Sequence, residues 1–285
     1  NGLFQAYAAK MPYVERDGVK IYYEDTGGDG EVIFMTHGFG SGCKMWDGQM
    51  ELSSKFRVIR WDMRGHALSD SPDDAAKYNK QHQVDDMAAV LDACGVQQAV
   101  FLGHSMGAYD NMLFYLSSPE HAARVKALVI FGSGPGFAKA KARESWNLNA
   151  DKLSSGYAAK GLDALVGSDR DKGHTAQGAR VGLAHAARNV FGQRDHDPLY
   201  ASMPDGASVA ATHLQDIRVP VLIIIGERDK QFRASSEMMK AKIPGAQMVL
   251  VADAGHMANE KQPRLFNEHV SRFAGSLPPA AASRL

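Results

Sequence analysis

The chain has 285 residues, of which 45% are hydrophobic and 22% are charged, and its 32 basic side chains balance 32 acidic ones. This composition is typical of a folded soluble protein and excludes general disorder, which needs fewer apolar and more charged residues. No Lys- or Arg-rich stripe stands out, so we expect no nucleic-acid partner, because binding to a phosphate backbone depends on clustered cations. No apolar run approaches the roughly 20 residues that span a bilayer, so we expect no membrane segment.

Two cysteines, Cys43 and Cys94, are too few for a disulfide framework and do not form a CxxC pair. We therefore predict reduced thiols and a cytoplasmic protein. Residues 1–10 lack a basic start and a long apolar centre, so we interpret them as a cloning remnant or a loose extension and not as a signal peptide. The sequence carries no signal for a particular oligomeric state.

Short apolar segments predict a series of strands. An alternating segment at 19–25 follows 13–16, and Asp17-Gly18 between them is typical of a type I′ hairpin turn. Six nearly continuous apolar runs follow, at 31–36, 57–62, 99–103, 127–132, 220–226 and 248–252. Such continuous runs are typical of parallel strands that helices cover on both faces.

Helical patterns alternate with these runs, at 81–93, 106–116 and 263–273. This alternation predicts an α/β fold in which helices flank a mostly parallel sheet. Over eighty residues between the runs ending at 132 and starting at 220 contain no clear strand, and a structureless loop of that size is implausible.

We therefore expect a helical cap at 134–216, with helices at 157–166 and 177–190. The core is then formed by 11–133 and 217–276, and the Pro- and Ala-rich tail at 277–285 is expected to be mobile.

The sharpest chemical signal is the sequence GHSMG at 103–107, which follows an apolar strand directly and opens a helix. This strand–turn–helix context gives the G-x-S-x-G pattern its meaning, because a sharp turn exposes the Ser105 hydroxyl at the edge of the sheet. Gly103 and Gly107 remove side chains that would collide with neighbouring backbone. Ser105 is therefore the candidate nucleophile.

A serine needs a base to take its proton, and His256 is the candidate because it follows the strand that ends near residue 252. Asp229, in the turn after the strongest apolar run, is the candidate carboxylate that orients the imidazole. Glu227 and Asp253 are the nearest rivals, but Glu227 sits earlier in its turn, and closeness along the chain to His256 does not place Asp253 beside it.

The reaction also needs donors for a developing oxyanion. The main-chain N–H of Met106 is one candidate, and that of Phe39 in the HGFG turn is the second. His37, Gly38 and His104 are expected to shape the substrate pocket. Trp146, an apolar residue of the predicted cap, is a candidate for the roof of that pocket.

Several motifs occur together in a familiar order: HGFG at 37–40 with Trp46 downstream, DMRGHALS at 62–69, GHSMG, GERD at 226–229 and Gly255-His256. From about residue 13 to 273 the chain resembles the α/β-hydrolase superfamily, and it looks closest to the branch of small carboxylesterases and lipase-like enzymes. The turn at 62–69 is structural in that family, and Ala67 here replaces its second glycine.

The resemblance implies a serine hydrolase that cleaves carboxylic esters through an acyl-enzyme intermediate, without a metal or organic cofactor. A serine at 105 excludes relatives that use an Asp nucleophile, such as epoxide hydrolases. Carbon–carbon bond hydrolysis, perhydrolase or lactonase activity would use the same triad and remain alternatives, as does a ligand-binding receptor on the same fold. Acyl and alcohol preferences are not evident from the sequence.

Overall fold

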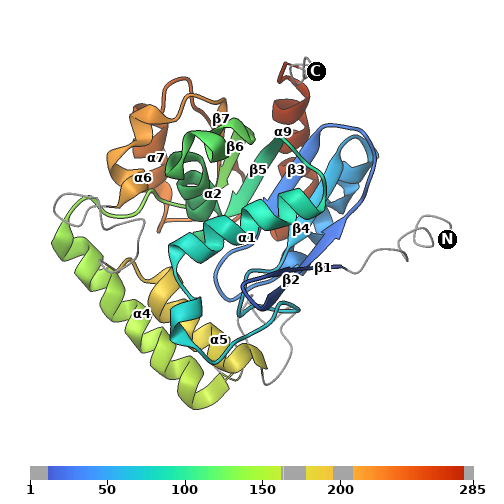
Figure 1. The fold of residues 1–285 in the computed structure, drawn as a ribbon. Helices are drawn as coiled ribbons and strands as arrows, with labels where there is room; N and C mark the ends of the chain where they lie inside the picture. The colour runs from blue at the N-terminus through green and yellow to red at the C-terminus, as the bar shows by residue number, and fades with distance from the viewer. Residues whose placement is uncertain (1–11, 162, 164–177, 195–207, 279–285) are drawn as a thin grey trace.

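The computed structural model describes residues 12–161, 163, 178–194 and 208–278. Within them, eight strands form one sheet in the order β1-β2-β4-β3-β5-β6-β7-β8 (Figure 1). β2 is antiparallel to β1 and β4, and all other neighbours are parallel. The strands are β1 (Tyr13–Arg16), β2 (Val19–Asp25), β3 (Val32–Thr36), β4 (Arg57–Trp61), β5 (Ala99–His104), β6 (Val125–Phe131), β7 (Val221–Gly226) and β8 (Gln247–Val251).

These strands confirm the apolar runs to within two residues at each end. The predicted hairpin is also present, because β1 and β2 pair from Arg16–Val19 outward and both turn residues, Asp17 and Gly18, have positive φ angles of 52° and 71°. Positive φ at both central positions is the requirement of a type I′ turn.

Helices cover both faces of the sheet, which explains why its strands are apolar on both sides. On β3, Phe34 belongs to the core beneath α1 and α2, whereas Ile33 and Met35 belong to the core beneath η1 and α9. Figure 1 shows α1 lying across the front of the sheet. The helices and 3₁₀ segments that belong to the core are η1 (Cys43–Ser54), η2 (Ala75–Lys77), α1 (Lys80–Ala93), α2 (Met106–Ser117), α3 (Pro119–Ala123), α7 (Arg233–Lys242), α8 (Ala258–Lys261) and α9 (Pro263–Gly275).

The insertion, by which we mean residues 134–216, contains helices and no strand in the part that the structure describes. α4 and α5 contact each other and lie away from the sheet, at the lower left of Figure 1. The elements are α4 (Ala140–Lys160), α5 (Gly178–Ala186), the π-helical turn η4 (Ala187–Phe191), α6 (Val209–Thr212) and the 3₁₀ turn η6 (Leu214–Asp216).

The helix predicted at 157–166 has the wrong bounds. α4 begins at Ala140 and ends at Lys160, where Gly161 with φ 59° follows, while 162 and 164–166 lie outside the described residues. Only three of its residues are buried, so the apolar period that would have marked its start is weak. The helix predicted at 177–190 is confirmed as α5 and η4 together.

Leu277, which was predicted to begin a mobile tail, packs partly buried against the core beneath α9. The rest of the predicted tail from residue 279, like the extension at 1–10, lies outside the described residues. In the described part of the chain, no helix combines the length and apolarity that crossing a membrane requires.

Candidate active site

Ser105 lies between the end of β5 and the start of α2 with φ 52° and ψ −117°. A residue other than glycine adopts this conformation only when its surroundings enforce it. Its N–H donates to the Phe131 carbonyl (2.8 Å), and its carbonyl accepts from the Tyr109 N–H (3.2 Å) and the Ser133 hydroxyl (2.7 Å). These bonds hold the turn, and the Ser105 side chain remains partly exposed.

Gly103 explains how the turn fits beneath α2. A Cβ at this position would lie 2.5 Å from the Ala108 Cα atom and 2.6 Å from the Asn111 amide nitrogen. Neither contact is sterically possible, so the predicted reason for a glycine before the serine is confirmed. The close packing also fixes the start of α2, where main-chain N–H groups point out of the helix.

His256 and Asp229 lie together although 27 residues separate them. His256 Nδ1 is 2.8 Å from Asp229 Oδ2, and the Asp229 side chain is almost fully buried. The other carboxylate oxygen of Asp229 accepts from the Phe232 N–H (3.3 Å). Because a carboxylate only accepts hydrogen bonds, this pairing puts the proton of a neutral imidazole on Nδ1 and leaves Nε2 as the basic atom.

The two rival carboxylates are engaged elsewhere. Asp253 forms an ion pair with Arg228 at the surface, and its N–H donates to Glu227 Oε2 (3.2 Å). Asp229 is therefore the carboxylate that holds His256.

His256 packs against His104, the residue before Ser105, in the sharp turn between β5 and α2, which we call the elbow. The ring centroids of His104 and His256 are 4.5 Å apart, and His104 Nε2 is 3.1 Å from the His256 carbonyl oxygen. Gly132 follows Phe131, whose carbonyl accepts from the Ser105 N–H. A Cβ on Gly132 would lie 3.2 Å from His256 Nδ1, so the glycine leaves room for the imidazole. The imidazole thus lies at the elbow.

The loop after β3 packs directly on the elbow. A Cβ on Gly38 would lie 2.7 Å from His104 Nδ1 and 3.3 Å from the Ser105 Cβ, so only glycine permits this approach. The loop consequently brings the main chain of Phe39 to the same edge of the sheet as Ser105 and Met106. The side chains of Phe39 and Met106 are both largely buried.

Two histidines predicted for the pocket have supporting positions. His37 is fully buried, where its Nε2 accepts from the Met63 N–H (3.0 Å) and its Nδ1 donates to the Gly38 carbonyl (2.7 Å), so it stabilises the loop that follows β3. His104 is also buried and lies against Phe131, with ring centroids 4.6 Å apart.

Trp146, on α4, contacts Phe191, which in turn packs against the loop after β3. Its indole N–H donates to the Phe191 carbonyl (2.7 Å), and the two rings lie 4.6 Å apart. The ring centroid of Phe39 lies 4.9 Å from that of Phe191 and 5.8 Å from that of Tyr157. Aromatic residues of the insertion therefore cover Phe39, and Trp146 forms the outer layer.

Two residues at this edge had no prediction attached to them. Ser133 is buried, and its hydroxyl donates to the Ser105 carbonyl. Phe232 stacks on the His256 ring. Both follow the carboxyl ends of parallel strands, β6 and β7, and this shared position is the signal that could have identified them.

Asp62, in the turn at 62–69, has a structural role as expected. Its two carboxylate oxygens accept from the N–H groups of Cys43 (2.5 Å) and Leu68 (3.0 Å). Burial raises the pKa of this carboxyl to about 6, although both N–H donors favour its charged form. Ala67, which stands where the family has glycine, adopts a positive φ of 45°.

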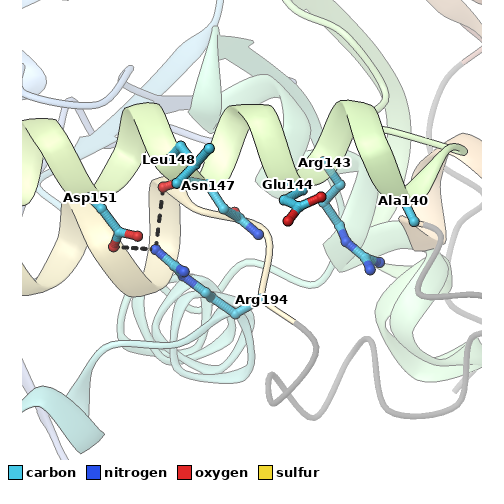
Figure 2. A pocket seen from close by; sticks show the side chains of 7 residues that line it. All are labelled: Ala140, Arg143, Glu144, Asn147, Leu148, Asp151 and Arg194. Carbon is cyan, nitrogen blue, oxygen red and sulfur yellow. Dashed lines mark hydrogen bonds and ion pairs between the residues drawn. The ribbon is translucent and has the colours of Figure 1, made fainter.

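A hollow of about 320 Å³ lies on α4 (Figure 2). Two of its charged groups pair with each other, since Arg194 contacts Asp151 Oδ1 (2.5 Å), and it contains none of the residues predicted for chemistry. In the described residues, no group of three or more His, Cys, Asp or Glu side chains is arranged to hold a metal ion. The lining residues of the hollow are Ala140, Arg143, Glu144, Asn147, Leu148, Asp151 and Arg194.

A family model described as alpha/beta hydrolase fold matches residues 31–263 of the chain. The chain belongs to this family. A Bacillus subtilis relative, the putative 2-succinyl-6-hydroxy-2,4-cyclohexadiene-1-carboxylate synthase, is 28% identical over 271 residues, which cover 92% of this chain and 97% of the relative.

Two further proteins are similar to the chain. The bifunctional esterase/perhydrolase of Acinetobacter calcoaceticus is 39% identical over 129 residues, 44% of this chain and 46% of that protein. The crystal structure of the enol-lactonase from Burkholderia xenovorans LB400 superimposes with a TM-score of 0.73 at 24% identity, over 93% of this chain and 100% of that one. This structural likeness shows the α/β-hydrolase fold.

Proposed function

We propose that the chain is a serine hydrolase that cleaves carboxylic esters of modest size, with Ser105, His256 and Asp229 as its catalytic triad. The observation that carries the proposal is the 2.8 Å hydrogen bond between His256 and Asp229, held against an elbow whose serine has φ 52°. A nucleophile, a base and an orienting carboxylate are the three groups that acyl transfer requires.

In the proposed first half-reaction, the Ser105 hydroxyl attacks the ester carbonyl carbon while His256 Nε2 takes its proton. The main-chain N–H groups of Phe39 and Met106 donate to the oxyanion that forms, and the loss of one such donor typically lowers turnover about 10²- to 10³-fold. Asp229 stabilises the imidazolium. His256 then gives its proton to the alcohol that leaves, and the acyl group stays on Ser105.

In the second half-reaction, His256 takes a proton from a water molecule that attacks the acyl carbon. The bond to the Ser105 oxygen breaks, His256 returns the proton to that oxygen, and the acid is released. Activity is expected to fall towards acid pH, because a protonated His256 accepts no proton. The steps need no metal or organic cofactor.

The similarity to an esterase/perhydrolase at 39% identity favours an ester substrate. The synthase from Bacillus subtilis belongs to the same family, so the family alone does not decide the reaction. We further propose that the insertion at 134–216 is a cap over the site, because its Phe191 and Tyr157 lie against Phe39 in the loop after β3.

The test is turnover of p-nitrophenyl esters of increasing acyl length by the wild type and by Ser105→Ala. We expect the variant to lose about 10⁴-fold or more in kcat, since removing the nucleophile of a triad removes its function as a unit. Ser276→Ala, at the end of α9, is the matched control and should retain activity. Retained activity in Ser105→Ala would contradict the proposal, while a lactone, a vinylogous diketone and a peroxide in the same panel distinguish the alternative reactions.

A further inference from the structure

The imidazole of His256, which contacts the His104 ring at a tilt, stacks on the ring of Phe232. Phe232 lies nearly parallel to it, with ring centroids 5.0 Å apart and an angle of 19° between the planes. Offset parallel stacking is a favoured aromatic geometry, and the face of a phenyl ring also attracts a cation. The ring is therefore placed to contact the imidazole in both of its protonation states.

Phe232 contacts the carboxylate partner as well. Its main-chain N–H donates to Asp229 Oδ1 (3.3 Å), while Asp229 Oδ2 bonds the imidazole. Phe232 itself is fixed at the start of α7, because its carbonyl accepts from the Ser236 N–H (2.9 Å) and the Ser235 hydroxyl (3.0 Å). One residue thus holds Asp229 through its backbone and His256 through its ring.

We propose that Phe232 is a positioning residue for the base: its ring restricts rotation of the His256 imidazole and stabilises the imidazolium that forms during turnover. The proposal rests on the proposed function, because it requires His256 to act as the base. Restricted rotation keeps Nδ1 on Asp229, the orientation in which the proposed function has Nε2 take the Ser105 proton, and attraction to the ring face adds to the stabilisation that Asp229 supplies.

The charged and titratable groups around His256 are the same in a variant at 232. Asp229 binds Nδ1, and the His104 ring lies 4.5 Å away. At the exposed rim of the site, Arg228 pairs with Asp253, and Glu227 accepts from the Asp253 N–H. A change of the ring at 232 therefore isolates the contribution of the stacked face.

The experiment compares wild type, Phe232→Leu, Phe232→Tyr and the control Phe56→Leu by pH–rate profiles on one p-nitrophenyl ester. Leucine keeps an apolar side chain but removes the ring face, tyrosine restores the face, and Phe56 belongs to the core beneath η1 and α9. In Phe232→Leu, kcat should fall about 3- to 10-fold with KM within about twofold, and the acid limb should move about 0.5–1 unit to lower pH because the imidazolium is less stable. Phe232→Tyr should stay within about twofold of wild type, and Phe56→Leu should show no shift.

Three outcomes would overturn the inference: an unchanged acid limb in Phe232→Leu, an equal loss in Phe232→Tyr, or the same shift in Phe56→Leu. Phe232→Met, which also lacks a ring, replaces the leucine variant if that variant does not fold. Ser105→Ala measured in parallel separates the two proposals. Its inactivity together with an unaffected Phe232→Leu contradicts only the role of Phe232, whereas an active Ser105→Ala contradicts the proposed function.

Discussion

Ser105 owes its unusual backbone to its neighbours. Its positive φ is unfavourable for a residue with a Cβ, by about 1–3 kcal/mol, so surrounding bonds must supply the difference. The Phe131 carbonyl holds its N–H, and the Ser133 hydroxyl holds its carbonyl. The Ser133 carbonyl shares the proton of the Ser235 hydroxyl (3.2 Å) with the Phe232 carbonyl (3.0 Å), which ties the elbow to the first turn of α7.

Ser133→Ala should therefore loosen the elbow. The variant removes one donor to the Ser105 carbonyl, so we expect a loss of about 1 kcal/mol in the free energy of unfolding. Misplacement of the nucleophile should lower kcat about 10-fold with little change in KM. Urea denaturation and steady-state kinetics measure the two effects.

Ser117→Ala, which removes a hydroxyl that bonds the Phe114 carbonyl in α2 and the His121 ring in α3, is the matched control. Equal kcat values for Ser133→Ala and wild type would show that Ser133 does not position the nucleophile.

At the scale of single residues, the sequence predicted those site residues that belong to a local motif or directly follow a strand. Ser105 follows a strand within G-x-S-x-G, and Asp229 and His256 each follow a strand of the same sheet, so the contact between Asp229 and His256 could be inferred from topology. The ring of Phe232 lies on His256 from a different loop, and no spacing along the chain encodes that contact.

At the scale of elements, Asp62 joins η1 to the turn that follows β4. Its carboxylate accepts N–H groups from both segments and is fully buried. An aspartate in an unfolded chain has a pKa of about 4, whereas the pKa of Asp62 in the folded protein is raised to about 6. Between these two pH values, the folded protein binds a proton that the unfolded chain has released. The stability that this proton contributes is complete below about pH 4 and is lost as pH rises through 6.

The Asp62→Asn variant lacks this titration. From pH 7.5 to pH 5, the free energy of unfolding of the wild type should therefore rise by about 1 kcal/mol relative to that of the variant. Glu24 and Asp25 are present in both proteins, and hydrogen bonds from Lys44 to Glu24 and from Arg57 to Asp25 lower their pKa values against the effect of burial. Urea denaturation of both proteins at the two pH values gives the difference. The raised pKa of Asp62 would be contradicted if the difference between the free energies of unfolding of the two proteins stayed constant, or if it changed in the opposite direction.

The elements that the sequence predicted well are those that the sheet buries. β3, β6 and β7 are buried along their whole length, so their apolar runs stand out. α4 has 21 residues but buries only Arg143, Ala150 and Tyr157, so its sequence resembles that of a solvated segment. A weak apolar stripe hides a helix even where the helix is long.

At the scale of the whole molecule, the fold brings together residues from three distant parts of the chain. β5, β7 and β8 are parallel strands of one sheet, so the residues that follow them, Ser105, Asp229 and His256, lie at one edge. The insertion adds aromatic residues to the same edge, where Phe191 contacts Phe39. Which of its side chains meet this edge depends on the bounds of α4, which the sequence did not mark.

The central claim is that Ser105 is a nucleophile activated by His256, and covalent labelling with diethyl p-nitrophenyl phosphate tests it most directly. The account predicts one diethylphosphoryl group per chain, located on Ser105 by peptide mass mapping, with one p-nitrophenolate released. It predicts no label in Ser105→Ala and labelling about 10²-fold slower or more in His256→Gln. A label on another residue, or an unchanged rate in His256→Gln, would contradict the account.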